Sequence, residues 1–266
     1  MQLGELHDQA WFPAIFRDGL TDALQSVLNL GAVYAPIASR LGRAIAASGA
    51  QRVVDLCSGG GGPWPWLQKS IGLQQGAEVE VWLTDKFPNV GALERARAAS
   101  HGAIRYCDQP IDATHVPAEL TGFRTMFTSI HHFAPAETEA VLRDAVDARQ
   151  GIGIFDTCTR HPLTILLVWV VPVAALLTTP FLRPFRWSRL FWTYLIPVIP
   201  FALWFDGVVS CLRSYSPGEL REMTELISAP GYTWEFGEES RIPGVLPVTY
   251  VVGYPTLVES RKVSAS

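Results

Sequence analysis

The chain has 266 residues and a formal net charge of −4, from 21 Lys and Arg against 25 Asp and Glu. This balance argues against a dedicated nucleic-acid-binding protein, which needs clustered positive charge to contact phosphates. Hydrophobic residues make up 48% and charged residues 17%, which excludes a disordered polar chain, and the length suits one large domain or a domain with an insertion.

Strands and helices alternate along the first 155 residues. We expect helices over residues 20–30 and 35–47, because apolar residues recur there at spacings of three and four. The alternation that follows predicts a parallel sheet with helices on both faces. The expected strands are 52–56, 78–84, 104–107, 123–129 and 151–155, and the expected helices are 63–71, 90–99 and 135–148.

The chain closes with two consecutive strands. Ser216-Pro217-Gly218-Glu219 is a capping box with proline at the first helical position, so a helix is expected from there to residue 228. The expected strands 233–236 and 248–252 follow without a helix between them. Consecutive strands joined by a loop pair antiparallel.

A run of four glycines follows the first expected strand. Residues 59–62 lack β-carbons, so the backbone can approach a ligand closely and adopt positive φ, and such a turn at the carboxyl end of a strand is a usual ligand site. A dinucleotide fingerprint fails because Trp64 and Pro65 stand where its third glycine would be, and no Gly-Lys-Ser/Thr follows to make a P-loop. Two acids at strand ends remain, and they suit a cation near Asp55 and a ribose diol near Asp85.

These residues resemble the motifs of the class I S-adenosylmethionine-dependent methyltransferases. Residues 53–62, Val-Val-Asp-Leu-Cys-Ser-Gly-Gly-Gly-Gly, are similar to the first motif, acid-x-Gly-x-Gly-x-Gly, with Cys57 in place of the first glycine. Leu83-Thr84-Asp85 is similar to the second motif, whose acid takes the ribose hydroxyls. Ile111-Asp112-Ala113 resembles the segment that meets the adenine amino group, and residues 127–133 resemble the fourth motif, beside the transferred methyl. The resemblance covers most of the chain outside residues 161–205.

The resemblance implies a fold and a cofactor. The implied fold is α/β, a Rossmann-like seven-stranded sheet, mostly parallel with the last strand antiparallel and with helices on both faces. This chain adds a hydrophobic helical insertion after the fifth strand. The implied cofactor is S-adenosyl-L-methionine (SAM), with S-adenosylhomocysteine (SAH) as product. The residues implied to bind it are Asp55, Cys57, Ser58, Gly59, Gly60, Gly61, Asp85, Lys86, Asp112, Ala113 and Ser129.

The chemistry of methyl transfer points to the histidines after the fourth strand. Transfer from a sulfonium is an in-line displacement, so the protein mainly positions the acceptor and excludes water, and no metal is required. The four cysteines also form no Cys-x-x-Cys pair for zinc or dithiol chemistry. An alcohol, phenol or amine acceptor can need a base, and we expect His132, with His131 as the alternative, because neighbours on an extended segment point to opposite sides. The competing interpretation is an imidazole that caps the next helix or lines the pocket.

Four further residues are candidates for contact with the acceptor. Trp11 lies in the N-terminal segment, which we expect to form a lid, although packing on the sheet is an equal alternative. Asp206, Arg213 and Tyr215 follow the apolar block where it rejoins the domain. A structural ion pair or a helix cap is the alternative for these three.

Residues 161–205 form an apolar insertion that contains Arg183, Arg186 and Arg189 and no Asp, Glu or Lys. Residues 163–182 are long enough to cross a hydrocarbon core of about 30 Å, whereas residues 190–205 are too short. Both ends rejoin one sheet, and a spanning hairpin would place the arginines on the outer side, against the positive-inside tendency. We therefore expect a monotopic insertion in one leaflet, with arginines near anionic head groups. A lid over the catalytic mouth and a homodimer contact are the alternatives.

The expected organisation is a lid of N-terminal helices (1–50), a SAM-binding core (51–160), the insertion (161–205) and the C-terminal part of the core (206–266). The expected function is methyl transfer to a small or lipophilic acceptor loaded from the membrane. The alternative is a non-catalytic, membrane-associated sensor or scaffold that binds SAM or SAH, and a nicotinamide oxidoreductase is a third option. The N-terminus lacks the pattern of a secretory signal, so we expect a cytoplasmic location at the inner face of the membrane.

Overall fold

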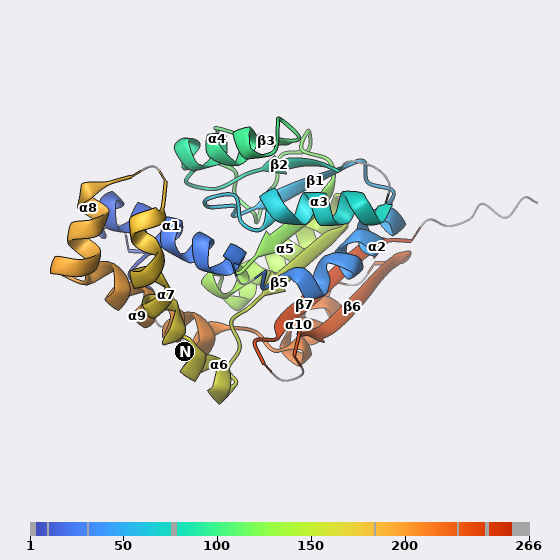
Figure 1. Cartoon of the computed structure of the whole chain (residues 1–266). Helices are drawn as coiled ribbons and strands as arrows, with labels where there is room; N and C mark the ends of the chain where they lie inside the picture. Colours follow the sequence, from blue (N-terminus) through green and yellow to red (C-terminus); the bar gives the residue numbers. More distant parts are fainter. Residues whose placement is uncertain are drawn as a thin grey trace, which may run out of the picture.

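The structure, a computed structural model, describes residues 4–9, 11–30, 32–75, 79–183, 185–227, 229–242 and 245–256. Within these residues the centre is a seven-stranded sheet in the order β3-β2-β1-β4-β5-β7-β6 (Figure 1). The strands are β1 (Arg52–Leu56), β2 (Glu80–Leu83), β3 (Ile104–Tyr106), β4 (Phe123–Phe127), β5 (Ile152–Asp156), β6 (Tyr232–Glu239) and β7 (Val248–Pro255). The first five pair in parallel, and β7 runs antiparallel to both β5 and β6. The predicted fold class is confirmed.

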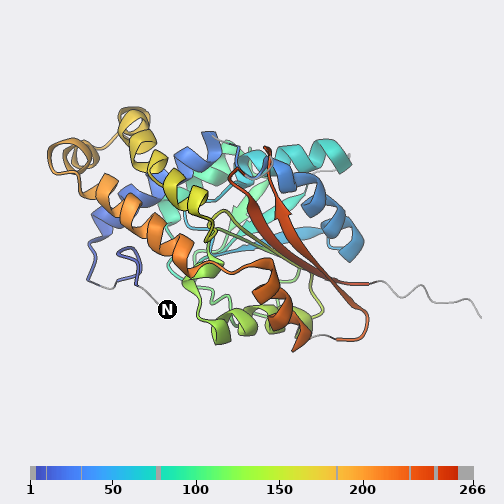
Figure 2. The same cartoon turned by 90° about the horizontal axis from the view of Figure 1, so that it is seen from below.

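Helices cover both faces of the sheet (Figure 2). Because both faces are buried, the parallel strands are apolar runs whose alternate residues, such as Val53 and Val54, belong to different cores. The first core lies under α2, α3 and α4, and the second lies under α5 and α10. These helices are α2 (Ala38–Ser48), α3 (Trp64–Gln75), α4 (Val90–Ala99), α5 (Pro135–Asp147) and α10 (Pro217–Glu225).

Local sequence signals set the ends of several elements. Pro135 and Pro217 open α5 and α10, and the predicted capping box is present, with Ser216 Oγ accepting from Glu219 N at 3.2 Å. Gly49, with φ of 70°, ends α2 in the left-handed conformation. Residue 78 of the expected second strand and residue 228 of the expected last helix lie outside the described residues.

The insertion after β5 folds into a helical layer beside the sheet (Figures 1 and 2). Its elements are α6 (Pro162–Leu167), α7 (Val170–Thr178), η3 (Thr179–Phe181), α8 (Trp187–Leu190), η4 (Phe191–Leu195) and α9 (Val198–Arg213). Together with α1 (Ala14–Leu30) it encloses a third, smaller core that includes Leu20, Ala175, Ile199 and Leu203. We call α1 and residues 162–213 the helical cap. The expected boundary at residue 206 falls inside α9, and α2, expected in the lid, packs on α3 and β7 instead.

The arginines of the cap do not lie as the sequence suggested. Arg189 is buried, and its Nη1 lies 2.8 Å from Asp22 Oδ2, while Arg186 Nη1 lies 3.4 Å from Asp18 Oδ2. Both acids belong to α1. The prediction that these arginines face lipid head groups is wrong for Arg189, because an acid of the neighbouring helix neutralises its charge inside the cap.

Part of the cap has the length and composition of a membrane helix. Among the described residues, Pro162–Phe181 has a mean hydropathy of 2.1 over its most apolar stretch, of which only 28% is buried. Trp187–Leu195 and Val198–Arg213 are long and apolar enough only when taken as a pair, and the pair is bent by 73°. Composition alone does not distinguish such helices from the core helices of a soluble protein.

Candidate active site

The glycine turn lies where the strand order of the sheet reverses. The β2 and β4 strands flank β1 on opposite sides, and in α/β sheets ligands bind at the carboxyl ends of strands around such a point. Gly59 and Gly61 have φ values of 53° and 104°, which glycine adopts without steric cost. Cys57 also has a positive φ, 56°, at the position where the resembled motif has glycine. For an L-residue this conformation costs roughly 1 kcal/mol.

Asp55 lies buried behind the turn. Its side chain accepts hydrogen bonds from Thr125 Oγ1 at 2.6 Å and from Ser58 Oγ at 2.7 Å, and its backbone oxygen accepts from Thr84 N at 2.8 Å. Burial raises the pKa of Asp55 to about 6, although the hydroxyl groups oppose this rise. Asp55 therefore ties the ends of β1, β2 and β4 to the glycine turn, and the predicted contact with a cation stays a prediction.

Asp85 is half-buried and faces the glycine turn from the end of β2. Its Oδ2 accepts from Gly59 N and its Oδ1 accepts from Phe87 N, both at 2.8 Å. The backbone oxygen of Asp85 accepts from Ile111 N at 2.9 Å, which brings the segment that carries Asp112 to the same end of the sheet. The structure thus joins three parts of the chain that the sequence assigned to cofactor binding.

Lys86 and Asp112 form an exposed pair beside this acid. Lys86 Nζ lies 2.7 Å from Asp112 Oδ2, while Thr114 donates to Asp112 Oδ1 from both its nitrogen and its hydroxyl. The Lys86 ammonium and the Thr114 donors lower the pKa of Asp112 to about 2. Ala113 packs into the core beneath. The Asp112 carboxylate is therefore ionised at the exposed edge of the site, beside Lys86.

Helix α1 of the cap contacts the glycine turn directly. Gln25 Nε2 donates to Gly60 O at 2.6 Å, and the Thr21 methyl lies beside Gly59 and Gly60. A β-carbon at Gly60 would displace the Gln25 amide, so this close approach depends on glycine. Sequence reasoning missed the contact, because no local pattern links Gln25 to a turn 35 residues later.

The two histidines follow β4 in a 3-10 turn, η2 (Ile130–His132), and their ring centroids are 4.5 Å apart. His131 is buried, with Nδ1 2.7 Å from Asp156 Oδ2. His132 is 30% exposed, with Nδ1 3.0 Å from Asp8 Oδ2. The prediction that the two side chains point to opposite sides is wrong, because the segment is helical rather than extended.

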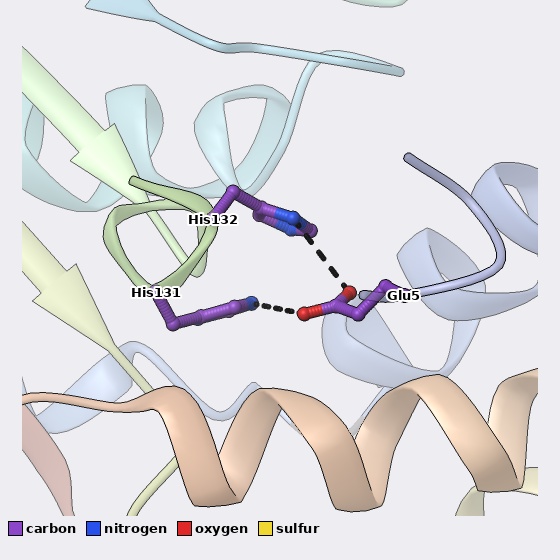
Figure 3. Close-up of side chains that lie close together, drawn as sticks. All are labelled: Glu5, His131 and His132. Carbon is purple, nitrogen blue, oxygen red and sulfur yellow. Dashed lines mark ion pairs between the residues drawn. The ribbon is translucent and has the colours of Figure 1, made fainter. Parts of the chain in front are cut away.

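Both imidazoles lie close to Glu5 of the N-terminal segment (Figure 3). Glu5 is 3% exposed, with Oε1 4.0 Å from His131 Nε2 and Oε2 3.7 Å from His132 Nδ1. Burial raises the pKa of Glu5 to about 7. Sequence reasoning missed Glu5 and Asp8. In the sequence both acids belong to a polar stretch before the first apolar helix. This pattern argues against a secretory signal but does not indicate a functional site.

Residues of α9 hold the N-terminal segment against the histidine turn. Asp206 accepts from Leu6 N at 2.7 Å and from His7 N at 3.1 Å. Arg213 Nη2 donates to His132 O at 2.6 Å. Asp206 and Arg213, predicted as acceptor contacts, therefore have structural partners at this site, in agreement with the alternative stated for them.

The remaining candidates lie around the same turn or away from it. Tyr215 OH donates to Phe133 O at 2.8 Å, directly after the histidines. Ser129 Oγ donates to Phe127 O at 2.8 Å at the end of β4. Trp11 is 69% exposed, so in this structure it is a surface residue rather than part of a closed lid.

Comparison with known proteins gives matches to solved structures. No protein-family model matches the sequence, and no curated protein matches it. PigF with SAH is similar with a TM-score of 0.53 and 16% identity over 93% of this chain and 63% of PigF. NcsB1, an O-methyltransferase from neocarzinostatin biosynthesis in complex with SAM and 2-hydroxy-5-methyl naphthoic acid, has a TM-score of 0.50 and 14% identity over 91% of this chain and 58% of NcsB1.

This likeness identifies the fold. The chain has the fold of the class I methyltransferases, as the sequence motifs predicted. It spans 63% and 58% of the lengths of these two proteins.

Proposed function

We propose that this protein transfers a methyl group from SAM to a small or lipophilic acceptor by in-line displacement. The observation that carries the proposal is the Asp85 carboxylate bonded to Gly59 N at 2.8 Å, at the carboxyl ends of β1 and β2. The cofactor named for PigF and NcsB1, SAH or SAM, supports the same cofactor here.

The residues around the turn suit each part of this cofactor. The turn at Gly59 to Gly61 exposes backbone without side chains, and Asp85 offers two oxygens for a ribose diol. Asp112, which Lys86 keeps ionised, suits the adenine amino group. SAM supplies an electrophilic methyl group, so the protein has to orient the acceptor and exclude water.

His132 is the proposed base for an acceptor that carries a proton, with His131 as the alternative. Asp8 Oδ2 lies 3.0 Å from His132 Nδ1, which orients the ring and leaves Nε2 to take the proton. The ring is partly exposed, whereas His131 is buried and held by Asp156 through Nδ1. Proximity to the end of β4, where the fourth motif of the resembled family lies, supports this assignment.

We further propose that the helical cap lies in one leaflet at the inner face of the cell membrane and admits a lipophilic acceptor from it. Large apolar side chains are exposed along the insertion, which is the support for this part. They include Leu166, Trp169, Val173, Leu177, Phe181, Trp187 and Leu195. Arg183, exposed between α7 and α8, suits an anionic head group.

Cofactor binding by isothermal titration calorimetry tests the assignment of Asp85. Asp85→Ala should weaken binding of SAH by about 10-fold to 100-fold, because hydrogen bonds to a charged group contribute about 1.5–3 kcal/mol. Asp108→Ala, at an exposed acid after β3, is the matched control and should stay within about 2-fold of the unchanged protein. Thermal unfolding of both variants checks that they fold. Absence of binding to the unchanged protein, or equal affinity in Asp85→Ala, would contradict the proposal.

A product assay separates the enzyme from the alternative function. The protein is incubated with methyl-labelled SAM and a panel of phenols, thiols, amines and lipids, and mass spectrometry detects products. A methylated product supports the enzyme. Binding of SAH without any product across the panel supports the membrane-associated sensor or scaffold.

A further inference from the structure

We propose that Glu5, His131 and His132 form a binding site for a divalent transition-metal ion, with Asp8 at its edge. No local sequence pattern indicates a metal site, because Glu5 is more than 120 residues away from the histidines. The fold brings one ligand atom from each of the three side chains within 4.8 Å of the others. In Figure 3 both imidazole rings are directed at the Glu5 carboxylate.

The distances are close to those of a zinc site. Glu5 Oε1 lies 4.0 Å from His131 Nε2, and Glu5 Oε2 lies 3.7 Å from His132 Nδ1. Ligands bound to zinc at about 2.0–2.2 Å with tetrahedral angles lie about 3.4 Å from one another. Side-chain shifts of about half an ångström would close the site. Two histidines and one carboxylate leave a coordination position open, which is typical of catalytic rather than structural metal sites.

A second carboxylate prepares His131 as a ligand. Asp156 Oδ2 lies 2.7 Å from His131 Nδ1, and Cys158 N donates to Asp156 Oδ1 at 2.8 Å. With the proton held on Nδ1, the lone pair of Nε2 faces Glu5. A carboxylate behind a histidine in this way fixes the tautomer and ring orientation of metal-binding histidines.

Glu5 supplies an independent sign that a cation belongs here. Its Oε1 is buried and accepts no hydrogen bond from any residue that the structure describes. The Oε1 atom lies 3.9 Å from Arg213 Nη1 and 4.0 Å from His131 Nε2, beyond hydrogen-bond range, and metal coordination is one of the ways in which proteins satisfy such a buried carboxylate oxygen. Around it, the described residues bring together the acids Glu5, Asp8, Asp156 and Asp206 with one guanidinium, that of Arg213. A divalent ion would balance this excess of negative charge.

The ion would give the histidine pair a defined role in the methyl transfer proposed above, and this part of the inference rests on that function. An acceptor hydroxyl or thiol that binds at the open position loses its proton to solvent, because a bound metal lowers the pKa of its ligand. The acceptor oxygen or sulfur then attacks the methyl carbon, and the carbon–sulfur bond of the sulfonium breaks with its electron pair on sulfur. In this arrangement His132 is a ligand through Nδ1 rather than a base, and the ion takes the place of the proton between this nitrogen and Asp8 Oδ2.

Metal binding is tested without any activity assay. The full chain is treated with chelator and titrated with Co²⁺, whose visible absorption reports the ligand set, and Zn²⁺ affinity is measured by competition. We expect one ion per chain. Glu5→Gln and His131→Asn should each weaken binding by at least about 10-fold, and Asp156→Asn, which changes no ligand, should weaken it by about 10-fold to 100-fold.

The control is His115→Asn, since His115 is an exposed histidine 4.0 Å from Asp144 and outside the cluster. It should bind the ion as the unchanged protein does. Glu5→Gln keeps the shape of the side chain and removes a buried charge, so this variant should fold, which thermal unfolding checks. Absence of Co²⁺ binding, or equal binding by Glu5→Gln, would overturn the inference. If the protein binds the metal but does not bind SAH, the proposed function is contradicted and the metal site is still supported.

Discussion

The sheet and the helical cap are both rich in apolar residues, but they use them differently. In α2, which packs on the sheet, Leu41 and Ile45 are buried and polar residues face outward. In α7 of the cap, Leu177 is 70% exposed, and Phe181 beyond its end is 79% exposed. A layer that covers a sheet hides its apolar stripe, whereas the cap has apolar residues on its outer side as well. The difference is the basis of the membrane contact proposed for the cap.

Buried charged groups are balanced in two ways in this molecule. In the cap, Arg189 is neutralised by Asp22 across two helices. In the sheet, Asp55 is held by the hydroxyl groups of Thr125 and Ser58. Arg124 of β4, also buried, is paired with Asp144 of α5 at 2.5 Å, so a buried arginine in each region is neutralised by an acid of a neighbouring helix, whereas the buried Asp55 is held by neutral donors.

The largest expected effect comes from removing the apolar surface of the cap. Serine at Leu177, Phe181, Trp187 and Leu195 together should abolish flotation with vesicles of phosphatidylethanolamine and phosphatidylglycerol. Burial of each side chain in lipid contributes about 1.5 kcal/mol to the free energy of membrane binding, so the four substitutions together remove about 6 kcal/mol of it.

The matched control replaces exposed apolar residues outside the cap, Leu226→Ser with Ile242→Ser, and should float as the unchanged protein does. Failure of the unchanged protein to float would contradict membrane association. If the cap variant instead changed a dimer to a monomer in gel filtration, the cap surface would be a contact between copies.

The next largest effect compares the buried ion pair of Arg189 with the partly exposed ion pair of Arg186. Arg189→Met leaves Asp22 largely buried with Arg95 at 3.4 Å, and should lower the free energy of unfolding in urea by about 3 kcal/mol. Arg186→Met should cost less than about 1 kcal/mol, because Arg186 and Asp18 are both partly exposed. The double variant Arg189→Met with Asp22→Leu should recover most of the loss. Equal effects of the two single variants would show that burial does not distinguish the pairs.

The smallest expected effect is the pH dependence of stability that Asp55, the buried acid of β1, produces. Burial raises the pKa of Asp55 to about 6 from 3.8, so the folded protein takes up a proton at this group before the unfolded chain does. The stability that follows is present at low pH and lost as pH rises through 6. From pH 7 to pH 5, Asp55 should add about 1 kcal/mol to the free energy of unfolding. Asp55→Asn should lack this gain, and Asp108→Asn should keep it.

Elements whose signals are local could be predicted from the sequence. The strand at Arg52–Leu56 and the helix at Val90–Ala99 match their expected ranges, and Pro135 opens its helix as expected. The glycine turn and Asp85 also meet as expected, because parallel strands end at one edge of a sheet.

What could not be predicted depends on partners far along the chain. Helix α1 begins at Ala14, six residues before its expected start, and its Gly19 packs against Ile199 of the insertion. Glu5 meets the histidines, and Arg189 meets Asp22, across 126 and 167 residues respectively. Periodicity describes which residues of an element are apolar, but it does not say which other element will cover or neutralise them.

The continuity of α9 decides how this protein can be dissected. The helix begins at Val198 within the apolar layer and ends at Arg213, whose guanidinium donates to the backbone of His132. Excision of residues 163–205 would remove half of this helix, which would loosen the histidine turn as well as delete the exposed apolar surface. The insertion is thus not a detachable module, and loss of function in a shortened chain would bear on the proposed lipid contact only if the whole of α9 had been kept.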